Sequence, residues 1–356
     1  MGQWVGRVVW AFGSMLLIAT LLPVIPTNEW WVRIFDFPRA QIAALIALVL
    51  VAVAILGMFR RRTGLLLGVA LVPALTYQLI RILPYTAMAN EKVPSVAVCA
   101  ADERLRFLEA NVLQSNRNAQ ALLIMVREQR PDVLLLTETD AWWARQVAPL
   151  RSAYPHVVSE PRGNTYGMML FSKLPLSGTE VRHLFNPDVP SIRTELALPS
   201  GKRIDLYAVH PKPPKPGRDT AERDAEIVIV GREVRRRARP AIVAGDLNDV
   251  AWSDTTSLFQ EASGLLDPRV GRTLMPTFPA DLPLLRWPLD YVFVSPGFTL
   301  TRMERLSDFG SDHLPVLVEL CAAAVEPAKV VAPKIDQETR EEVRETINEA
   351  RDEARD

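Results

Sequence analysis

Apolar and polar positions divide the chain into two unlike parts. The first ninety residues hold three long apolar runs, Val8–Pro26, Ala40–Phe59 and Gly64–Ile80. Each run has about the length of a helix that crosses a bilayer, and three in succession are not typical of a soluble core. We therefore expect residues 1–88 to form a membrane anchor with three transmembrane helices. A cleaved signal peptide is the alternative for the first run, but no small-residue cleavage site precedes Asn28, which favours an uncleaved anchor.

The short loops between these runs predict how the anchor is oriented. Arg60, Arg61 and Arg62 lie between the second and third runs, and such basic loops stay in the cytoplasm. The Thr27–Arg39 loop carries both charges and is expected outside. With three spans, everything after Tyr85 then lies outside the cytoplasm. The sequence predicts a multi-pass protein of the plasma (inner) membrane.

Beyond a linker at residues 89–103, the pattern changes to short runs with strand-like alternation. A strand from Arg104 ends at Asn111, and a helix-period segment follows it. The continuous apolar run Val133–Thr137 is typical of a strand buried on both faces, and it ends at Glu138. This strand–helix–strand unit places Asn111 and Glu138 at strand ends, where α/β folds build their sites.

Later strands also end or begin at polar residues that can carry chemistry. His210 follows a strand, Asp246 and Asn248 follow another, and Asp290 begins a third. Asp312 and His313 form a turn that leads into the last strand. These strands are expected at Tyr166–Ser172, Thr194–Leu198, Arg203–Val209, Ala241–Ala244, Leu289–Ser295 and Val316–Leu320. The tail at residues 325–356 is rich in charge and poor in apolar residues, which predicts a solvated helix or disorder.

Charge adds one restriction. The chain has a formal net charge of zero, so a broad nucleic-acid-binding face is not expected. The net charge does not exclude a local basic patch.

Asp246 and Asn248 are the centre of the candidate chemistry. Gly245 ends the strand before them, and side chains two apart in extended chain point the same way. A carboxylate and a carboxamide aimed together suit a hard cation, a phosphate or an attacking water. The alternative is that Asp and Asn only form the turn.

Six short motifs in order decide between these alternatives. They are Asn111-Val, Leu-Thr-Glu138, Val-His210-Pro, Gly-Asp246-Leu-Asn248, Leu-Asp290-Tyr and Gly-Ser-Asp312-His313. The series resembles the endonuclease/exonuclease/phosphatase superfamily, which includes deoxyribonuclease I, abasic-site endonucleases, neutral sphingomyelinases and inositol phosphatases. The resemblance covers residues 104–320, and with the apolar runs in front the chain looks most like the bacterial membrane-anchored branch.

The resemblance implies an α/β fold, a four-layer α/β/β/α sandwich over residues 104–324, with the site at one mouth of the two sheets. It also implies that Glu138 ligates a divalent cation, which is Mg²⁺ or, as an alternative, Mn²⁺. Asn111 and Asp312 are then expected to help hold the metal or its waters. The implied catalytic roles are water activation by Asp246, phosphate binding by Asn248, a His313–Asp290 pair at the phosphate, and His210 near the leaving group.

Three further expectations accompany the resemblance. Tyr166 and Arg193 lie on strands that head toward the same mouth, and they either touch substrate or serve packing. Cys99 precedes the first strand and Cys321 follows the last. If those strands are antiparallel neighbours, as the family's fold implies, an extracytoplasmic compartment permits a disulfide.

The sequence thus predicts a membrane-anchored, divalent-metal-dependent phosphodiester hydrolase of nuclease type, an endonuclease being one form. Its expected partners are a phosphodiester substrate, from nucleic acid or a phospholipid headgroup, and the lipid bilayer. No protein partner is inferred. The alternatives are a phosphatase or phospholipase C-type enzyme acting on lipid headgroups, and an inactive scaffold or binding protein with the same fold.

Overall fold

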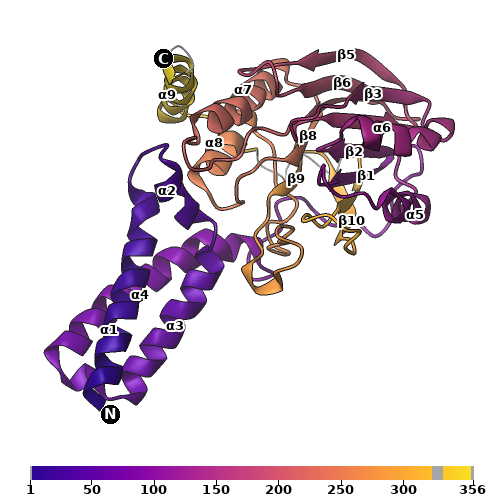
Figure 1. Cartoon of the computed structure of the whole chain (residues 1–356). Helices are drawn as coiled ribbons and strands as arrows, with labels where there is room; N and C mark the ends of the chain where they lie inside the picture. Colours follow the sequence, from indigo (N-terminus) through magenta and orange to yellow (C-terminus); the bar gives the residue numbers. More distant parts are fainter. Residues whose placement is uncertain (1, 323–331, 354–356) are drawn as a thin grey trace.

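The protein consists of a helical bundle and a sandwich of two β-sheets, described here for residues 2–322 and 332–353 of a computed structural model. Figure 1 shows the long helices extending to one side of the sandwich. The bundle and the segment after it comprise α1 (Gly2–Leu21), η1 (Leu22–Val24), α2 (Trp30–Arg33), η2 (Ile34–Asp36), α3 (Arg39–Ile55), η3 (Met58–Arg60), α4 (Arg62–Ile82) and η4 (Leu83–Tyr85).

The bundle has the length and composition of a membrane anchor. Two helical segments, Trp4–Val24 and Arg62–Tyr85, are long and apolar enough to cross a bilayer. The expected middle span corresponds to α3. It is long enough to cross a bilayer only when it is taken together with Trp30–Asp36, and the helix axis bends by 69° between these two segments. The structure therefore supports two spans by length and composition, and three if the bent pair is one span. It contradicts a simple loop between the first two runs, since α2 and η2 are helical there.

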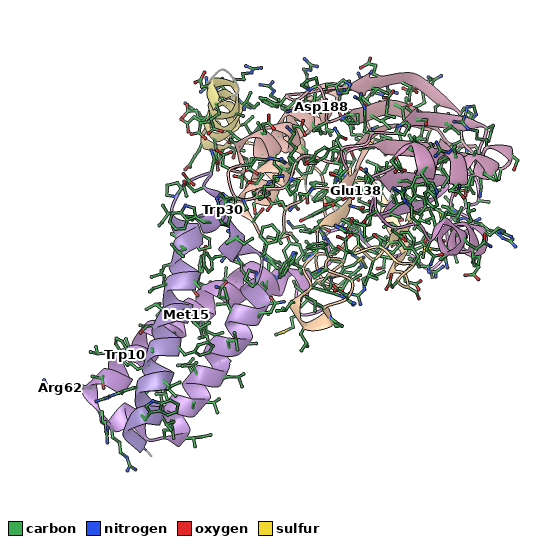
Figure 2. The ribbon with its side chains drawn as sticks, in the orientation of Figure 1. Trp10, Met15, Trp30, Arg62, Glu138 and Asp188 are labelled. Atoms are coloured by element: carbon green, nitrogen blue, oxygen red, sulfur yellow. A yellow bond between two sulfur atoms is a disulfide. The ribbon has the colours of Figure 1, made fainter. Side chains whose placement is uncertain are left out.

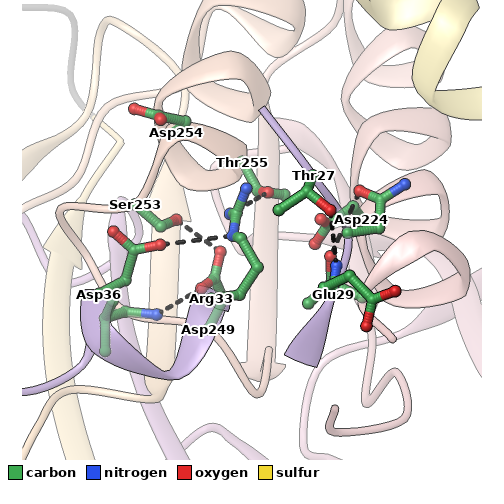
Figure 3. A network of polar contacts seen from close by, with 12 residues as sticks. Thr27, Glu29, Arg33, Asp36, Asp224, Asp249, Ser253, Asp254 and Thr255 are labelled. Atoms are coloured by element: carbon green, nitrogen blue, oxygen red, sulfur yellow. Dashed lines mark hydrogen bonds and ion pairs between the residues drawn. The ribbon is translucent and has the colours of Figure 1, made fainter. Parts of the chain in front are cut away.

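The segment between α1 and α3 is joined to the sandwich by buried polar contacts. The Trp252 indole N–H donates to the Asp36 carbonyl oxygen at 2.7 Å, and Arg33 Nη2 donates to Thr255 Oγ1 at 3.1 Å. Figure 3 shows Arg33 reaching from this segment to Asp36 and Thr255. From the C-terminal end of α4, Arg81 Nε donates to the carbonyl oxygen of the same Trp252 at 3.1 Å. The bundle is therefore packed against the sandwich rather than joined to it by the chain alone.

Two mixed sheets make up the sandwich. The first has the order β10-β11-β1-β2-β4-β3 and the second β5-β6-β7-β8-β9. The strands of the first are β1 (Arg104–Asn111), β2 (Val133–Thr137), β3 (His156–Glu160), β4 (Met168–Ser172), β10 (Thr299–Arg305) and β11 (Val316–Cys321). Those of the second are β5 (Leu176–Arg182), β6 (Ser191–Ala197), β7 (Arg203–Ala208), β8 (Ala241–Asp246) and β9 (Asp290–Val294).

Helices cover the outer face of each sheet. Leu122 and Val126 of α5 pack on the first sheet, and Ile227 and Val230 of α7 pack on the second. Between the sheets lies a separate apolar core that includes Phe107 and Leu206. This is the expected four-layer α/β/β/α arrangement. The covering helices are α5 (Ala119–Gln129), α6 (Ala141–Gln146), α7 (Ala221–Arg237) and α8 (Asp254–Ser263), with short turns η5 (Ala148–Ser152) and η6 (Pro283–Leu285).

The strands that the sequence pattern did not predict are all edge strands. They are β3, β5 and β10, each at the border of its sheet. Every residue of β3 is only half-buried, and most of β5 is exposed. An edge strand needs no continuous or strictly alternating apolar pattern, because one side of it meets solvent. The predicted strands are all present, with ends that coincide for β1 and β2 and shift by at most three residues for the others.

Cys99 and Cys321 form a disulfide, because β1 pairs antiparallel with β11 and brings Arg104 opposite Cys321. This confirms the expected pairing of the two cysteines.

The expectation for the tail is confirmed in part. α9 (Gln337–Glu353) is helical, but it is not fully solvated, because its Val343 and Ile347 are buried against Val228 and Leu258. Residues 325–331 and 354–356 of the expected tail lie outside the described residues.

Candidate active site

The polar residues at the ends of the inner strands meet where the two sheets face each other. Asn111 ends β1, Glu138 follows β2, Asp246 ends β8 and Asp290 begins β9. β1 belongs to the first sheet and β8 and β9 to the second, so the site forms only when the sheets pack. Figure 2 shows Glu138 within the sandwich, far from Trp10 and Met15 on the anchor.

Asn111 links the two sheets. Its Nδ2 donates to Glu138 Oε1 at 3.0 Å and to Asp246 Oδ2 at 3.1 Å. Its Oδ1 accepts the Leu113 backbone N–H at 2.9 Å, and Glu138 Oε2 accepts the Gln114 N–H at 3.1 Å. These bonds fix the direction of the Glu138 carboxylate and of one Asp246 oxygen.

Unusual backbone conformations aim the site residues. Glu138 has φ of 60° and Asn248 has φ of 52°, which non-glycine residues seldom adopt. Gly245, with φ of 136°, lies so close to β7 that a Cβ would be 2.0 Å from the Val209 carbonyl oxygen. Only glycine fits there, and Asp246 follows it as the last residue of β8, with Asn248 in the turn beyond.

His313 forms the expected pair with Asp290. His313 Nδ1 lies 2.9 Å from Asp290 Oδ2, and its Nε2 lies 3.6 Å from Asp246 Oδ2. Burial by itself would lower the pKa of His313, but Asp290 and Asp246 raise it to about 10. The imidazole is therefore protonated at neutral pH. Both ring nitrogens then carry protons, one for Asp290 and one that faces Asp246.

The two carboxylates around His313 respond in opposite directions. Burial and the neighbouring Asp290 raise the pKa of Asp246 above its ordinary value, although His313 and His210 oppose the rise. Burial would raise the pKa of Asp290 as well, but the charge and the hydrogen bond of His313 lower it instead. Asp290 thus stays ionised as the partner of His313, while Asp246 is the more basic of the two.

The loop after β7 completes one side of the site. His210 Nδ1 lies 3.1 Å from the Asp246 carbonyl oxygen, and Asn248 Nδ2 donates to the Pro211 carbonyl oxygen at 2.9 Å. The Tyr166 ring centroid is 5.7 Å from that of His210, and the Tyr166 hydroxyl accepts Arg218 Nη1 at 3.0 Å. Tyr166 is therefore beside the site, as expected.

Arg193 is the one predicted site residue that the structure does not bring to this cluster. It lies on β6 between inward-facing Ile192 and Thr194, so its side chain points to the outer face of the second sheet. There it pairs with Glu180 at 3.0 Å and lies 3.8 Å from Glu233 of α7. The expected strand direction is wrong, because β6 is antiparallel to β7 and runs away from the mouth. Its first residues lie at that end of the sheet, but the period-two alternation turns the Arg193 side chain to the outer face.

The donor set fits a hard divalent cation. Burial and the charge of Glu138 raise the pKa of Asp312, although His313 opposes the rise, and Asp312 Oδ1 is buried without a hydrogen-bond partner in the described chain. Carboxylate and amide oxygens are the ligands that Mg²⁺ or Mn²⁺ take. Asp246, Asp290 and His313 also lie close enough to hold an ion, with ligand atoms within 4.8 Å. We favour Glu138 and Asp312, because His313 Nδ1 and Asp290 already bond each other.

Sequence reasoning missed a third buried acid in this cluster. Glu109 of β1 is fully buried beside Asp290, with which its carboxyl group shares a side-chain hydrogen bond when Glu109 is protonated. Burial and the charges of Asp290 and Asp246 raise its pKa well above the ordinary value. The signal was in the sequence, because Glu109 is two residues from Asn111 and so shares its face of the strand.

Two more contacts could not be found from motifs. Arg223 of α7 is buried, and its Nη1 donates to the Asn248 carbonyl oxygen at 2.8 Å. The Phe278 ring centroid is 4.7 Å from that of His313. These residues support the site from outside the strand ends, and nothing in their local sequence marks them.

Solved structures share this fold. An endonuclease/exonuclease/phosphatase from Beutenbergia cavernae is 20% identical, with a TM-score of 0.50, over 62% of this chain and 72% of that one. The human Nocturnin catalytic domain is 18% identical, with a TM-score of 0.51, over 63% and 96%. D. rerio TDP2 complexed with a single-strand DNA product is 16% identical, with a TM-score of 0.52, over 61% and 98%. No curated protein matches the chain.

A family model matches the part of the sequence that contains the site residues. The model of the endonuclease/exonuclease/phosphatase family matches residues 106–313, from within β1 to the histidine that pairs with Asp290. This range holds all six motifs and more than half of the chain. The chain therefore belongs to the endonuclease/exonuclease/phosphatase family.

Proposed function

We propose that the protein is a membrane-anchored phosphodiester hydrolase that depends on a divalent metal. The observation that carries the proposal is the surplus of buried acids around one protonated histidine. Asp246, Asp290 and Asp312 surround His313, and Glu109 lies beside Asp246 and Asp290. Such a cluster is costly to bury unless a cation joins it. Its cost is explained if a metal and a phosphate complete the site.

Glu138 and Asp312 would hold the metal, with Asn111 orienting Glu138 through its bond to Oε1. A metal bound there would neutralise phosphate charge and polarise the P–O bond. The predicted part of Asn111 in holding the metal or its waters stays a prediction.

The chain's own groups suit hydrolysis by an attacking water. Asp246, with its raised pKa, accepts the proton of the water, and the water oxygen forms the new bond to phosphorus. Protonated His313 donates from Nε2 to a phosphate oxygen, with Asp290 holding its other nitrogen. Asn248 binds another phosphate oxygen. The P–O bond to the leaving group breaks, and His210 is placed to return a proton to the departing oxygen.

The domain is proposed to lie outside the cytoplasm. The Cys99–Cys321 disulfide supports this, because such bonds persist in oxidising compartments. The arginines at 60–62 support it through the positive-inside rule. A reporter fused after residue 322 and active only inside the cell would contradict this orientation.

The substrate class remains a prediction in its finer form. Nuclease-type activity is the expectation from the motifs, and the TDP2 structure with its single-strand DNA product is consistent with it. A phosphatase or phospholipase C-type activity on lipid headgroups is the alternative. The exposed Leu282, Leu284 and Leu285 before β9 favour the alternative.

The test uses the full chain in detergent, because Arg33 and Phe37 of the anchor contact the sandwich. Plasmid DNA, single-stranded DNA, RNA, a sphingomyelin analogue, an inositol phosphate and the soluble diester bis(p-nitrophenyl) phosphate are offered with Mg²⁺, with Mn²⁺ and with EDTA. We expect metal-dependent cleavage of at least one, abolished by EDTA and by Glu138→Ala. Metal binding without any turnover would instead support the scaffold alternative.

A further inference from the structure

The segment before β9 exposes three leucines beside the active site. Leu282, Leu284 and Leu285 have exposed fractions of 48%, 87% and 48%. They lie at the tip of a hairpin-like loop, here called the leucine loop (residues 281–286), which includes η6. Exposed leucines together on one short loop are atypical of a surface that faces only water.

The base of this loop is built against the catalytic residues. Phe278 and Trp287 close it through backbone hydrogen bonds, the shorter at 2.7 Å. The Phe278 ring packs on His313, and the backbone N–H of Ala280 donates to the Asp312 carbonyl oxygen at 2.7 Å. The leucine loop and the site therefore share one rigid element.

The tip of the loop is bound to the anchor. Gln41 Nε2 of α3 donates to the Leu284 carbonyl oxygen at 3.1 Å and lies 3.4 Å from that of Arg286. Beneath this contact, the Phe37 and Trp287 ring centroids are 5.7 Å apart. The loop thus meets the bundle near the first turn of α3. In Figure 1 the loop leading into β9 lies beside the upper end of α3.

The helix face below the loop is the one that lipid would cover. Gln41, Leu45 and Leu48 are spaced i, i+4 and i+7, so they share one face of α3. Leu45 and Leu48 are 36% and 64% exposed in the isolated chain. Gln41 is the polar residue at the end of this stripe, as expected near a membrane surface. The exposed leucines of the loop lie next to Gln41, and so extend the apolar face formed by Leu45 and Leu48.

The distance to the site agrees with the dimensions of a bilayer surface. The headgroup layer on each side of the hydrocarbon core is on the order of 6 Å deep. Three residues, 279–281, separate Phe278 from the first exposed leucine, Leu282, so the Cα atoms of the two are at most about 14 Å apart. With the leucines at the hydrocarbon boundary, Phe278 and the His313 ring it packs on would lie in or close above the headgroup layer.

We propose that the leucine loop is seated in the bilayer surface, with its leucines at the boundary of the hydrocarbon, and that the active site takes its phosphoester from a lipid headgroup. The inference rests on the proposed hydrolase function for its substrate, but the membrane contact of the loop does not. The bilayer is the occupant that the stripe on α3 indicates, because the same lipid would cover both surfaces.

Membrane contact is measured first and without activity. Both native cysteines form the disulfide, so Leu284→Cys adds a single reactive thiol. The full-length variant carries an environment-sensitive fluorophore there, in vesicles of phosphatidylethanolamine and phosphatidylglycerol. Nitroxide-labelled lipids should quench it strongly. The control is Ile124→Cys, at an exposed apolar position on α5. Quenching at Leu284 no greater than at Ile124 would overturn the proposal.

Substrate access is measured on the same vesicles. Replacement of Leu282, Leu284 and Leu285 by serine should lower release of the lipid headgroup by about ten-fold or more, because the loop loses its apolar contact. Hydrolysis of bis(p-nitrophenyl) phosphate should stay within about two-fold, since that diester needs no membrane contact. Replacement of the same leucines by methionine should preserve both rates, because the apolar surface is kept.

The opposing outcomes are distinct. Equal loss of both rates would reduce the loop to a support of the fold and overturn the proposal. Cleavage of added DNA without any lipid product would overturn the substrate class. If the wild-type chain hydrolyses nothing, the proposed function fails, and the quenching measurement still decides where the leucine loop lies.

Discussion

Two buried clusters of acids lie close together in this protein, and they differ in their counter-charges. The junction cluster joins the anchor to the sandwich and consists of Arg33, Asp36, Arg39, Arg223, Asp224 and Asp249. The site cluster consists of Glu109, Glu138, Asp246, Asp290 and Asp312, with His210 and His313 as its basic groups. The first has an arginine for every aspartate, while the second has far fewer cations than acids.

The difference separates a structural role from a functional one. In the junction cluster, Arg39 Nη2 lies 2.5 Å from Asp36, and Arg223 Nη2 lies 2.6 Å from Asp224. Each buried charge there is met within the chain. In the site cluster the pKa values of Glu109, Asp246 and Asp312 are raised, mainly by burial. Burial raises the pKa of Asp249 in the junction cluster as well, but Arg223 and Arg33 oppose that rise. Buried acids without such arginines would be tolerable only where an external cation and a phosphate bind.

The largest expected effect comes from the site cluster. Asp246→Ala and His313→Ala should each lower the turnover of a confirmed substrate by about 10²–10⁴-fold, by analogy with general acid–base groups. Asp246→Ala should keep its stability, since removal of one acid relieves repulsion, whereas His313→Ala leaves Asp290 buried without its cation and should unfold more easily. Turnover and thermal unfolding are measured on the same full-length preparations. Full activity in either variant would show that its assigned role is wrong.

The junction cluster should respond in the opposite way. Arg223→Met removes the cation that meets Asp224 and Asp249, and breaking a buried pair costs about 3–5 kcal/mol of unfolding free energy. Chemical unfolding in detergent measures the loss. The matched control is Arg302→Met, because Arg302 is 41% exposed and pairs with Glu304, so less than about 1 kcal/mol is expected. Equal losses of unfolding free energy in the two variants would show that the buried arginine contributes no more to stability than the exposed one.

A buried acid outside both clusters tests whether the pKa of a buried acid depends on a neighbouring cation as well as on burial. Glu226 of α7 has a pKa raised to about 8, by burial and by Glu222, while Lys212 bonds Glu222 at 3.2 Å. Between the ordinary value of 4.5 and about 8, the folded chain holds a proton that the unfolded chain has lost. Stability should therefore fall as pH rises through this window, by up to about 1.4 kcal/mol per pH unit, and level off above it.

The variant Glu226→Gln should remove this slope and be more stable than wild type at pH 9. Thermal unfolding from pH 5 to 9 measures it. A slope that persists in the variant would mean that other groups control stability in this window.

Metal binding gives the smallest of these effects. Mg²⁺ or Mn²⁺ at 100 times its dissociation constant should stabilise the wild-type chain by about 2.7 kcal/mol. Glu138→Ala should lose most of this gain, because Glu138 is a proposed ligand, while Arg223→Met should keep it. Unfolding with the metal and with EDTA provides the comparison. An equal gain in Glu138→Ala would place the ion elsewhere.

Much of the site was visible in the sequence because each motif is local. A strand that ends in a polar residue can be recognised from its own few residues, as for Asn111, Glu138 and Asp246. The edge strands β3, β5 and β10 were missed because partial exposure weakens their pattern. Arg193 was assigned to the mouth from its strand alone, although alternation along β6 directs it to Glu233.

The sequence by itself determined the family, the inner strands, the apolar spans and the set of acids and histidines at strand ends. Only the tertiary structure decided which acids are paired and which are not. Arg33 and Arg223 are far apart in the chain, yet one bonds Thr255 and the other lies 3.5 Å from Asp249 in the same junction. Charge balance in a buried cluster depends on packing between distant segments, and no local pattern records it.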